Sequence, residues 1–151
     1  MTDPGHDWLA ARIVDLAPDA VIFADREGRI VLWNAGAEAI FGFTAAEAVG
    51  QRMDFIIPER LRGRHWDGWA RVMETGVTRY GKELLAVPAL HKTGKTLSIE
   101  FSIALVRDAA GTILGPAAVM RDVTARFERD KALRQKVKEL ETRLAAVAPK
   151  G

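Results

Sequence analysis

Chemistry in this chain could centre on His65, which falls in a helical pattern of apolar residues. A helix is predicted over residues 59–74. Its apolar face contains Leu61, His65, Trp69 and Val72, which follow one another at intervals of four, four and three residues. A neutral imidazole on that face could bind iron through one ring nitrogen and leave the other to a hydrogen-bond acceptor. A histidine satisfied inside an ordinary core is the alternative, and the pattern leaves both open.

Other charged side chains near His65 could take part in binding or catalysis. Arg71 follows six residues later, and its guanidinium could pair with a carboxylate through two hydrogen bonds. Three acids lie near His65 in the sequence: Asp54, Glu59 and Asp67. No Ser-His-Asp order, metal pair or glycine-rich phosphate loop accompanies them. We therefore predict that the protein is not an enzyme.

Composition narrows the class of protein further. The chain has 151 residues, which fits one domain, and it has no cysteine, which excludes disulfides and thiolate chemistry. Its formal charge of +2 is too small to indicate direct nucleic-acid binding, and Arg60, Arg62 and Arg64 are interpreted as a solvated helix face. No apolar run approaches a membrane span, and the first residues do not resemble a secretory signal. We expect a cytoplasmic protein that does not contact a membrane.

The predicted elements mix strands and helices. Residues 20–24 and 29–33 predict a hairpin around a turn at 25–28, because Gly28 can supply the positive φ of a tight turn. Apolar residues alternate without a fault from Leu97 to Leu105, so Phe101 and Ile103 should share the buried face of a strand. Further strands are predicted at 83–90 and 113–121, and helices at 7–16, 37–41, 44–50 and 59–74. This order predicts an α+β domain.

The last part of the chain predicts a helix with a heptad seam. The seam consists of Leu133, Val137, Leu140, Leu144 and Val147, at steps of four, three, four and three. Two heptads are marginal as an independent coiled coil, so we expect the helix to pair with a partner. We predict a homodimer through this helix, with the N-terminal helix contributing.

Several motifs in this order resemble the PAS family. Residues 25–34 lead into 37–44 and 47–50 as in the N-terminal part of PAS domains, Lys92-Thr93-Gly94 resembles a family hairpin with Thr93 replacing Asp, and Arg121-Asp122-Val123-Thr124 resembles the motif that begins the exit helix. The resemblance covers residues 9–124. It implies a five-stranded antiparallel sheet with helices on one face, a ligand cavity between them, and signalling through the exit helix. We expect Thr124 to cap that helix.

The resemblance also implies a division of the chain. A cap helix should occupy residues 1–16, the PAS core 17–124, a coiled-coil-like signalling helix 125–147, and a disordered tail 148–151.

Residues 58–69 resemble the helix that carries the proximal histidine of rhizobial oxygen-sensing haem PAS domains. The resemblance implies His65 as the ligand of haem iron, Arg71 near a haem propionate, and a distal wall with Tyr80, Phe101 and Ile103. Leu85 replaces the distal arginine of those sensors. Trp66 and Trp69 are open to two interpretations, an aromatic wall for a ligand or packing of the core.

The ligand itself stays open at this point. Haem, another small organic ligand, or a cavity filled by side chains are the alternatives. Flavin is disfavoured, because the Asn-Cys-Arg run of light-sensing PAS domains and the Trp-x-Gly and Asn-Arg-Lys runs of redox PAS domains do not occur at the matching positions.

The predicted function is a sensory module that binds a small ligand and signals through its exit helix to a partner, either a kinase or a regulator. A ligand-free interaction and dimerisation module is the alternative, as is a co-regulator of transcription that acts through a DNA-binding partner.

Overall fold

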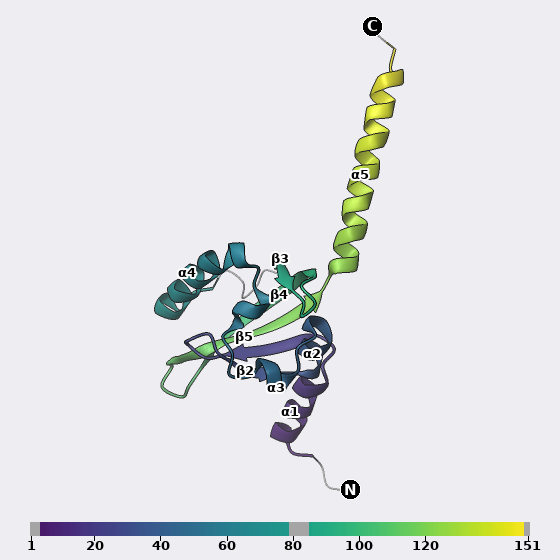
Figure 1. Cartoon of the computed structure of the whole chain (residues 1–151). Coiled ribbons are helices and arrows are strands. Elements are labelled where there is room, and N and C mark those ends of the chain that lie inside the picture. Colours follow the sequence, from purple (N-terminus) through teal and green to yellow (C-terminus); the bar gives the residue numbers. More distant parts are fainter. Residues whose placement is uncertain (1–3, 79–84, 150–151) are drawn as a thin grey trace.

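The computed structural model describes residues 4–78 and 85–149 of the chain, and its centre is a five-stranded antiparallel sheet (Figure 1). The strand order is β2-β1-β5-β4-β3, so the first hairpin lies at one edge and β3 at the other. The strands are β1 (Ala20–Ala24), β2 (Ile30–Trp33), β3 (Leu85–Leu90), β4 (Thr96–Arg107) and β5 (Ile113–Asp122). The α+β architecture with an antiparallel sheet is confirmed.

Helices surround this sheet at its ends and on one face. They are α1 (His6–Leu16), α2 (Ala35–Phe41), α3 (Ala45–Ala48), the 3-10 helix η1 (Met53–Ile56), α4 (Glu59–Thr75) and α5 (Thr124–Val147). The core between sheet and helices contains Ile22, Phe41, Ile56 and Ile99 among its buried side chains. Several elements begin one or two residues away from the predicted positions: α1 begins at His6, β2 at Ile30, α2 at Ala35, α3 at Ala45 and α5 at Thr124. The predicted strand at 83–90 begins at Leu85 in the structure, and residues 83 and 84 lie outside the described residues.

Asn34 joins three elements at the start of α2. Its side-chain oxygen accepts from the backbone N–H of Ala37 at 2.9 Å, which caps the N-terminus of α2, and also from the N–H of Val21 at 2.8 Å. Its amide nitrogen donates to the carbonyls of Val14, Ala17 and Asp19. One buried side chain therefore connects the end of α1 with β1 and α2.

The alternation predicted for β4 is present in its central part. Leu97 and Ile99 are buried, and Phe101 packs partly buried against the same core. Glu100 lies on the other face, where it accepts from the guanidinium of Arg126 at 2.7 Å. Ile103 is half-buried, two residues beyond Phe101 on the same side of the strand.

The junction between β5 and α5 differs from the predicted cap. Thr124 is the first residue of α5, and its hydroxyl makes no capping bond to the helix. The hydroxyl donates to Asp122 and accepts from the N–H of Ser98 on β4, while the Asp122 carboxylate also accepts from the Thr124 N–H. The prediction that Thr124 caps the helix was wrong, because Asp122 supplies the acceptor and Thr124 connects the helix to β4.

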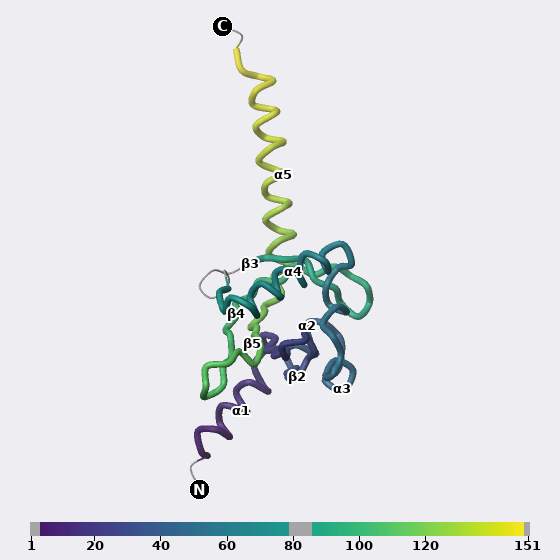
Figure 2. Tube along the Cα trace, turned by 90° about the vertical axis from the view of Figure 1, so that its left-hand side faces the viewer, coloured from purple at the N-terminus to yellow at the C-terminus, as the bar shows by residue number. Residues whose placement is uncertain are grey.

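Figures 1 and 2 agree that α5 extends away from the sheet, whereas α1 lies at the opposite end of the molecule. No residue of α5 is buried in the described chain, so the seam residues Leu133, Leu140 and Leu144 are exposed. Of the tail predicted at 148–151, residues 150 and 151 lie outside the described residues. Among the helices of the described chain, none is long and apolar enough to cross a membrane.

Candidate functional site

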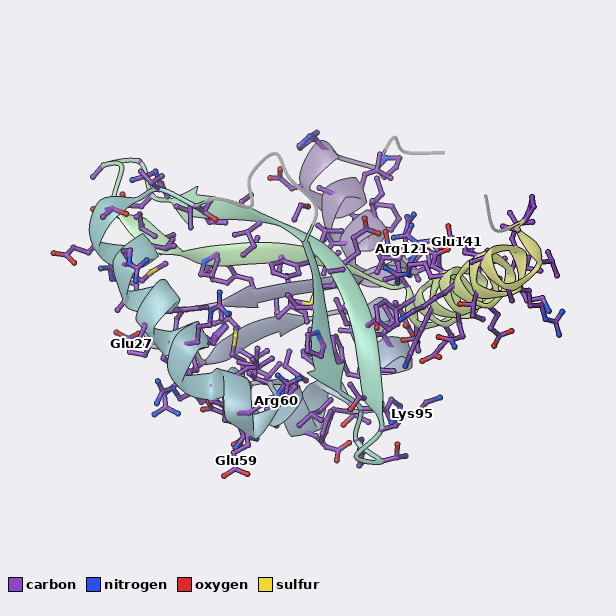
Figure 3. The ribbon with its side chains drawn as sticks, turned by 90° about the horizontal axis from the view of Figure 1, so that it is seen from above. Glu27, Glu59, Arg60, Lys95, Arg121 and Glu141 are labelled. Atoms are coloured by element: carbon purple, nitrogen blue, oxygen red, sulfur yellow. The ribbon has the colours of Figure 1, made fainter. Side chains whose placement is uncertain are left out.

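The candidate site lies along α4, a helix that covers the sheet without becoming part of its core. The helix follows Pro58 and ends at Gly76, whose φ of 69° is the left-handed conformation that glycine adopts readily. Its seventeen residues include none that is buried. Figure 3 shows Glu59 at the start of α4 pointing away from the sheet. The apolar face of the helix is only half covered, with Trp66 and Trp69 packed against the core.

His65 lies on this half-covered face and forms a cluster of three rings with Trp66 and Trp69. Its ring centroid is 4.7 Å from that of Trp66 and 5.8 Å from that of Trp69. Its Nδ1 atom is buried and has no hydrogen-bond partner within residues 4–78 and 85–149. Burial lowers the pKa of His65 below its usual value, with Arg52 lowering it further and Asp54 opposing the shift. The imidazole is therefore neutral near pH 7 and has an unused polar atom.

Trp66 is fixed by contacts at the N-terminal half of α4. Its indole N–H donates to the Asp54 carboxylate at 2.7 Å, and the guanidinium of Arg52 lies 3.9 Å from its ring centroid. Its ring also lies against Gly28, where an added Cβ would be 2.3 Å from Trp66 Cη2. These contacts favour packing over a ligand wall for Trp66.

Trp69 is fixed in the same way on the next turn. Its indole N–H donates to the backbone carbonyl of Arg26 at 2.8 Å, and its ring centroid lies 5.3 Å from that of Trp66. Because the polar end of Trp69 is already paired, its contribution to a ligand would come from the face of the ring alone.

The other predicted site residues lie in different surroundings. Arg71 is exposed, and six residues at about 100° each turn it to a different face of the helix from His65. Phe101 faces the core, and Leu85 is its backbone partner across the β3–β4 ladder. Tyr80 lies outside the described residues.

Sequence reasoning missed the groups that hold the two tryptophans. In the sequence Asp54 stands out only as an acid near His65, Arg26 and Gly28 only as residues of a predicted turn, and Arg52 carries no signal. A buried tryptophan usually finds an acceptor for its N–H, which is the one available signal, but the acceptors lie 12 and 43 residues away in the chain.

Comparison with known proteins fits this architecture. Residues 14–128 match the PAS fold family. The chain therefore belongs to the PAS family of sensory domains. A PAS domain of a protein from Colwellia psychrerythraea superimposes with a TM-score of 0.68 at 24% identity, over 78% of this chain and 96% of that one. That likeness concerns the fold.

Three relatives match parts of this chain, and two of them have names that refer to sensing or signal transduction. The Sensor protein FixL of Bradyrhizobium diazoefficiens is 42% identical over 53 residues, which is 35% of this chain and 10% of that protein. The signal transduction histidine-protein kinase AtoS of Escherichia coli is 29% identical over 125 residues, which is 82% of this chain and 19% of that protein. An uncharacterized protein of Azorhizobium caulinodans is 34% identical over 122 residues, 80% of this chain and 16% of that protein. The chain thus spans less than a fifth of each relative.

Proposed function

We propose that this chain is the sensory module of a signalling system and that it binds a small ligand against the His65 face of α4. The buried Nδ1 atom of His65 carries this proposal, because buried polar atoms without a partner are rare and indicate a missing one. The half-covered apolar face around it would gain burial from a flat, largely apolar ligand. A short polar group on the ligand would satisfy the imidazole.

Haem is the ligand that we propose for this face. A neutral imidazole in apolar surroundings suits an axial ligand of haem iron, and the sequence of α4 resembles haem-binding PAS domains around this residue. When bound, haem would supply an iron centre for diatomic gases. Leu85 offers no hydrogen-bond donor at the position of the distal arginine, so we expect discrimination in favour of carbon monoxide over oxygen. Arg71 faces elsewhere on α4, so its contribution to haem retention should be small.

Haemin titration of the purified full chain tests this proposal. We expect a Soret band that saturates at one haem per chain and that His65→Ala abolishes, while circular dichroism stays unchanged. His91→Ala is the matched control, because His91 lies in the β3–β4 hairpin, where its ring nitrogen is already bonded to Thr93. A normal Soret band in His65→Ala would end the assignment of His65 as the iron ligand.

We further propose that the chain forms a homodimer through α5 and that its signal passes along this helix. The seam residues of α5 are all at least half exposed, and a free helix of two heptads is marginal in water. The exposed apolar residues Trp8, Leu9 and Ile13 of α1 give a second surface for the same dimer. A histidine kinase is the proposed recipient of the signal, since one relative, AtoS, is a signal transduction histidine-protein kinase.

Sedimentation tests the dimer. Leu140→Glu on the seam should shift the protein toward monomer, whereas Thr142→Glu, two residues further round the helix, should not. A dimer that survives both Leu140→Glu and truncation after Thr124 would place the interface on α1 or on the sheet.

A dimer without a ligand is the second candidate function. It is favoured by the large apolar surface on α1 and α5, which needs no ligand to explain it. A dimer whose haemin titration shows no specific band, and whose native mass shows no bound molecule, would support that candidate.

A further inference from the structure

Two indole N–H groups attach α4 to other segments of the chain, and these two segments connect to different elements. Trp66 donates to Asp54 in η1, at the N-terminal half of the helix. Trp69 donates to the backbone carbonyl of Arg26, in the turn between β1 and β2. Because α4 has no buried residue, these bonds carry an unusual share of its attachment.

The second attachment continues into the sheet. The side chain of Arg26 donates from Nη1 to the backbone carbonyl of Ile113 at 2.9 Å. Ile113 is the first residue of β5, and it is buried. β5 ends at Asp122, directly before α5. A single residue, Arg26, therefore accepts a bond from α4 with its backbone and donates one to β5 with its side chain.

The turn that contains Arg26 is stiff enough to pass a displacement on. The Asp25 carboxylate accepts from the N–H groups of Glu27 and Arg29 at 3.0 and 2.9 Å, and the Asp25 carbonyl accepts from Gly28. The ring of Trp66 packs on Gly28 at the end of the same turn. Movement of α4 would thus shift the turn as a unit.

We propose that the Trp69–Arg26–Ile113 chain of hydrogen bonds couples the His65 face of α4 to β5, and through β5 to α5. This inference rests on the proposed function, since it assigns the regulation of the same site. Trp69 lies one turn after His65 on the same helical face, so a ligand seated against His65 moves the Trp69 indole relative to the sheet. Trp69 and Arg26 are positioning residues in this scheme.

A competing route exists at the C-terminal end of α4. The guanidinium of Arg107 packs against Gly76, since a Cβ added to Gly76 would be 2.7 Å from Arg107 Nη2. Arg107 Nη1 donates to the Gly111 carbonyl in the β4–β5 hairpin. This contact with α4 is one of packing, without a hydrogen bond between the two elements. Arg107→Ala separates the two routes.

Amide hydrogen exchange of the full chain without any ligand gives the first test. Trp69→Phe keeps an aromatic ring, although a smaller one, and removes the N–H, and Arg26→Gln removes the guanidinium. Each should raise exchange at residues 113–118 by about fivefold, the ratio expected for one net hydrogen bond. The double variant should exceed Arg26→Gln by little, because both changes break one chain. Asp54→Ala is the matched control, because it removes the acceptor of the Trp66 N–H and keeps the Trp66 ring against Gly28, and it should leave residues 113–118 unchanged.

Haemin gives the second test, with the Soret band and hydrogen exchange read on the same samples. Wild type and Asp54→Ala should show a haemin-dependent change of exchange in β5 and at the start of α5. Arg26→Gln should keep the Soret band and lose that change. The inference is overturned if Arg26→Gln keeps the haemin response, if Arg107→Ala alone removes it, or if Asp54→Ala matches Trp69→Phe in the first test. If haemin does not bind, the proposed ligand fails, and the ligand-free comparison still decides the coupling.

Discussion

Replacement of Asn34 by alanine should be one of the most damaging single changes in the domain. The side chain is 4% exposed, and it accepts from two backbone N–H groups, those of Val21 and Ala37. Its amide also donates to three carbonyls, including that of Val14 at 2.7 Å. Alanine provides neither function, and the surrounding backbone is too enclosed for water to replace the bonds fully.

The magnitude follows from the two donors left behind. An unsatisfied buried N–H costs about 1–3 kcal/mol, so the two together predict a loss of about 2–6 kcal/mol in the free energy of unfolding. That is a large part of the roughly 5–15 kcal/mol by which domains are usually stable. Urea unfolding followed by circular dichroism measures the loss, and α1 should lose protection from hydrogen exchange as well.

Two variants sharpen the test. Asn34→Asp keeps both acceptor functions and puts a carboxylate oxygen in place of the amide nitrogen, so the loss it causes combines the missing bonds to the carbonyls of Val14, Ala17 and Asp19 with repulsion between oxygens. Thr44→Ala breaks an exposed capping box and should cost about 1 kcal/mol. A loss below about 1 kcal/mol in Asn34→Ala would refute the reasoning, because it would mean that the freed N–H groups find other partners.

Three further predictions concern titration and close packing. Burial lowers the pKa of His65 below 6.5, so the free energy of unfolding should be full above about pH 6.5 and fall as the pH decreases through the folded-state pKa. In His65→Gln the free energy of unfolding should depend less on pH over this range. Lys92 bonds Glu47 at 2.6 Å and lowers the Glu47 pKa to about 2, so in Lys92→Ala an NMR titration should find that pKa closer to 4.5, and an unchanged value would contradict the assignment. Gly28→Ala should destabilise the domain by about 1–3 kcal/mol and change tryptophan fluorescence, since φ is +83° and the new methyl would meet Trp66; unaltered fluorescence would argue against the contact.

The strands and short helices could be predicted because their signals are local. The alternation from Leu97 to Leu105 indicates which side of β4 is buried. Thr44 and Glu47, three residues apart at the start of α3, form a capping box, a motif that is visible in the sequence. Pro88 lies on β3, an edge strand, as its missing N–H requires. Each of these features depends on residues within a few positions of one another.

The candidate site was only partly predictable because its attachments are not local. The helical pattern around His65 indicates which face of α4 points toward the sheet, and in the structure His65 lies beside the rings of Trp66 and Trp69. Nothing in the pattern indicates that α4 stays unburied, or that Trp69 bonds a turn 43 residues earlier. Thr124 illustrates the same point, since its hydroxyl accepts a hydrogen bond from the N–H of Ser98 on β4 and does not cap its own helix.

The weak attachment of α4 is what a sensor of this architecture requires. A ligand shifts a conformational equilibrium only by the difference in its affinity for the two states, so the responding element must be one whose displacement costs little. Elements with few buried contacts are the ones that open at low free energy. The core around Ile22 and Ile99 cannot respond in this way, because displacing it would expose buried apolar surface. α4 can respond, because two indole hydrogen bonds and half-buried rings hold it. Only the Trp69 bond continues, through Arg26, to β5, the strand that precedes α5.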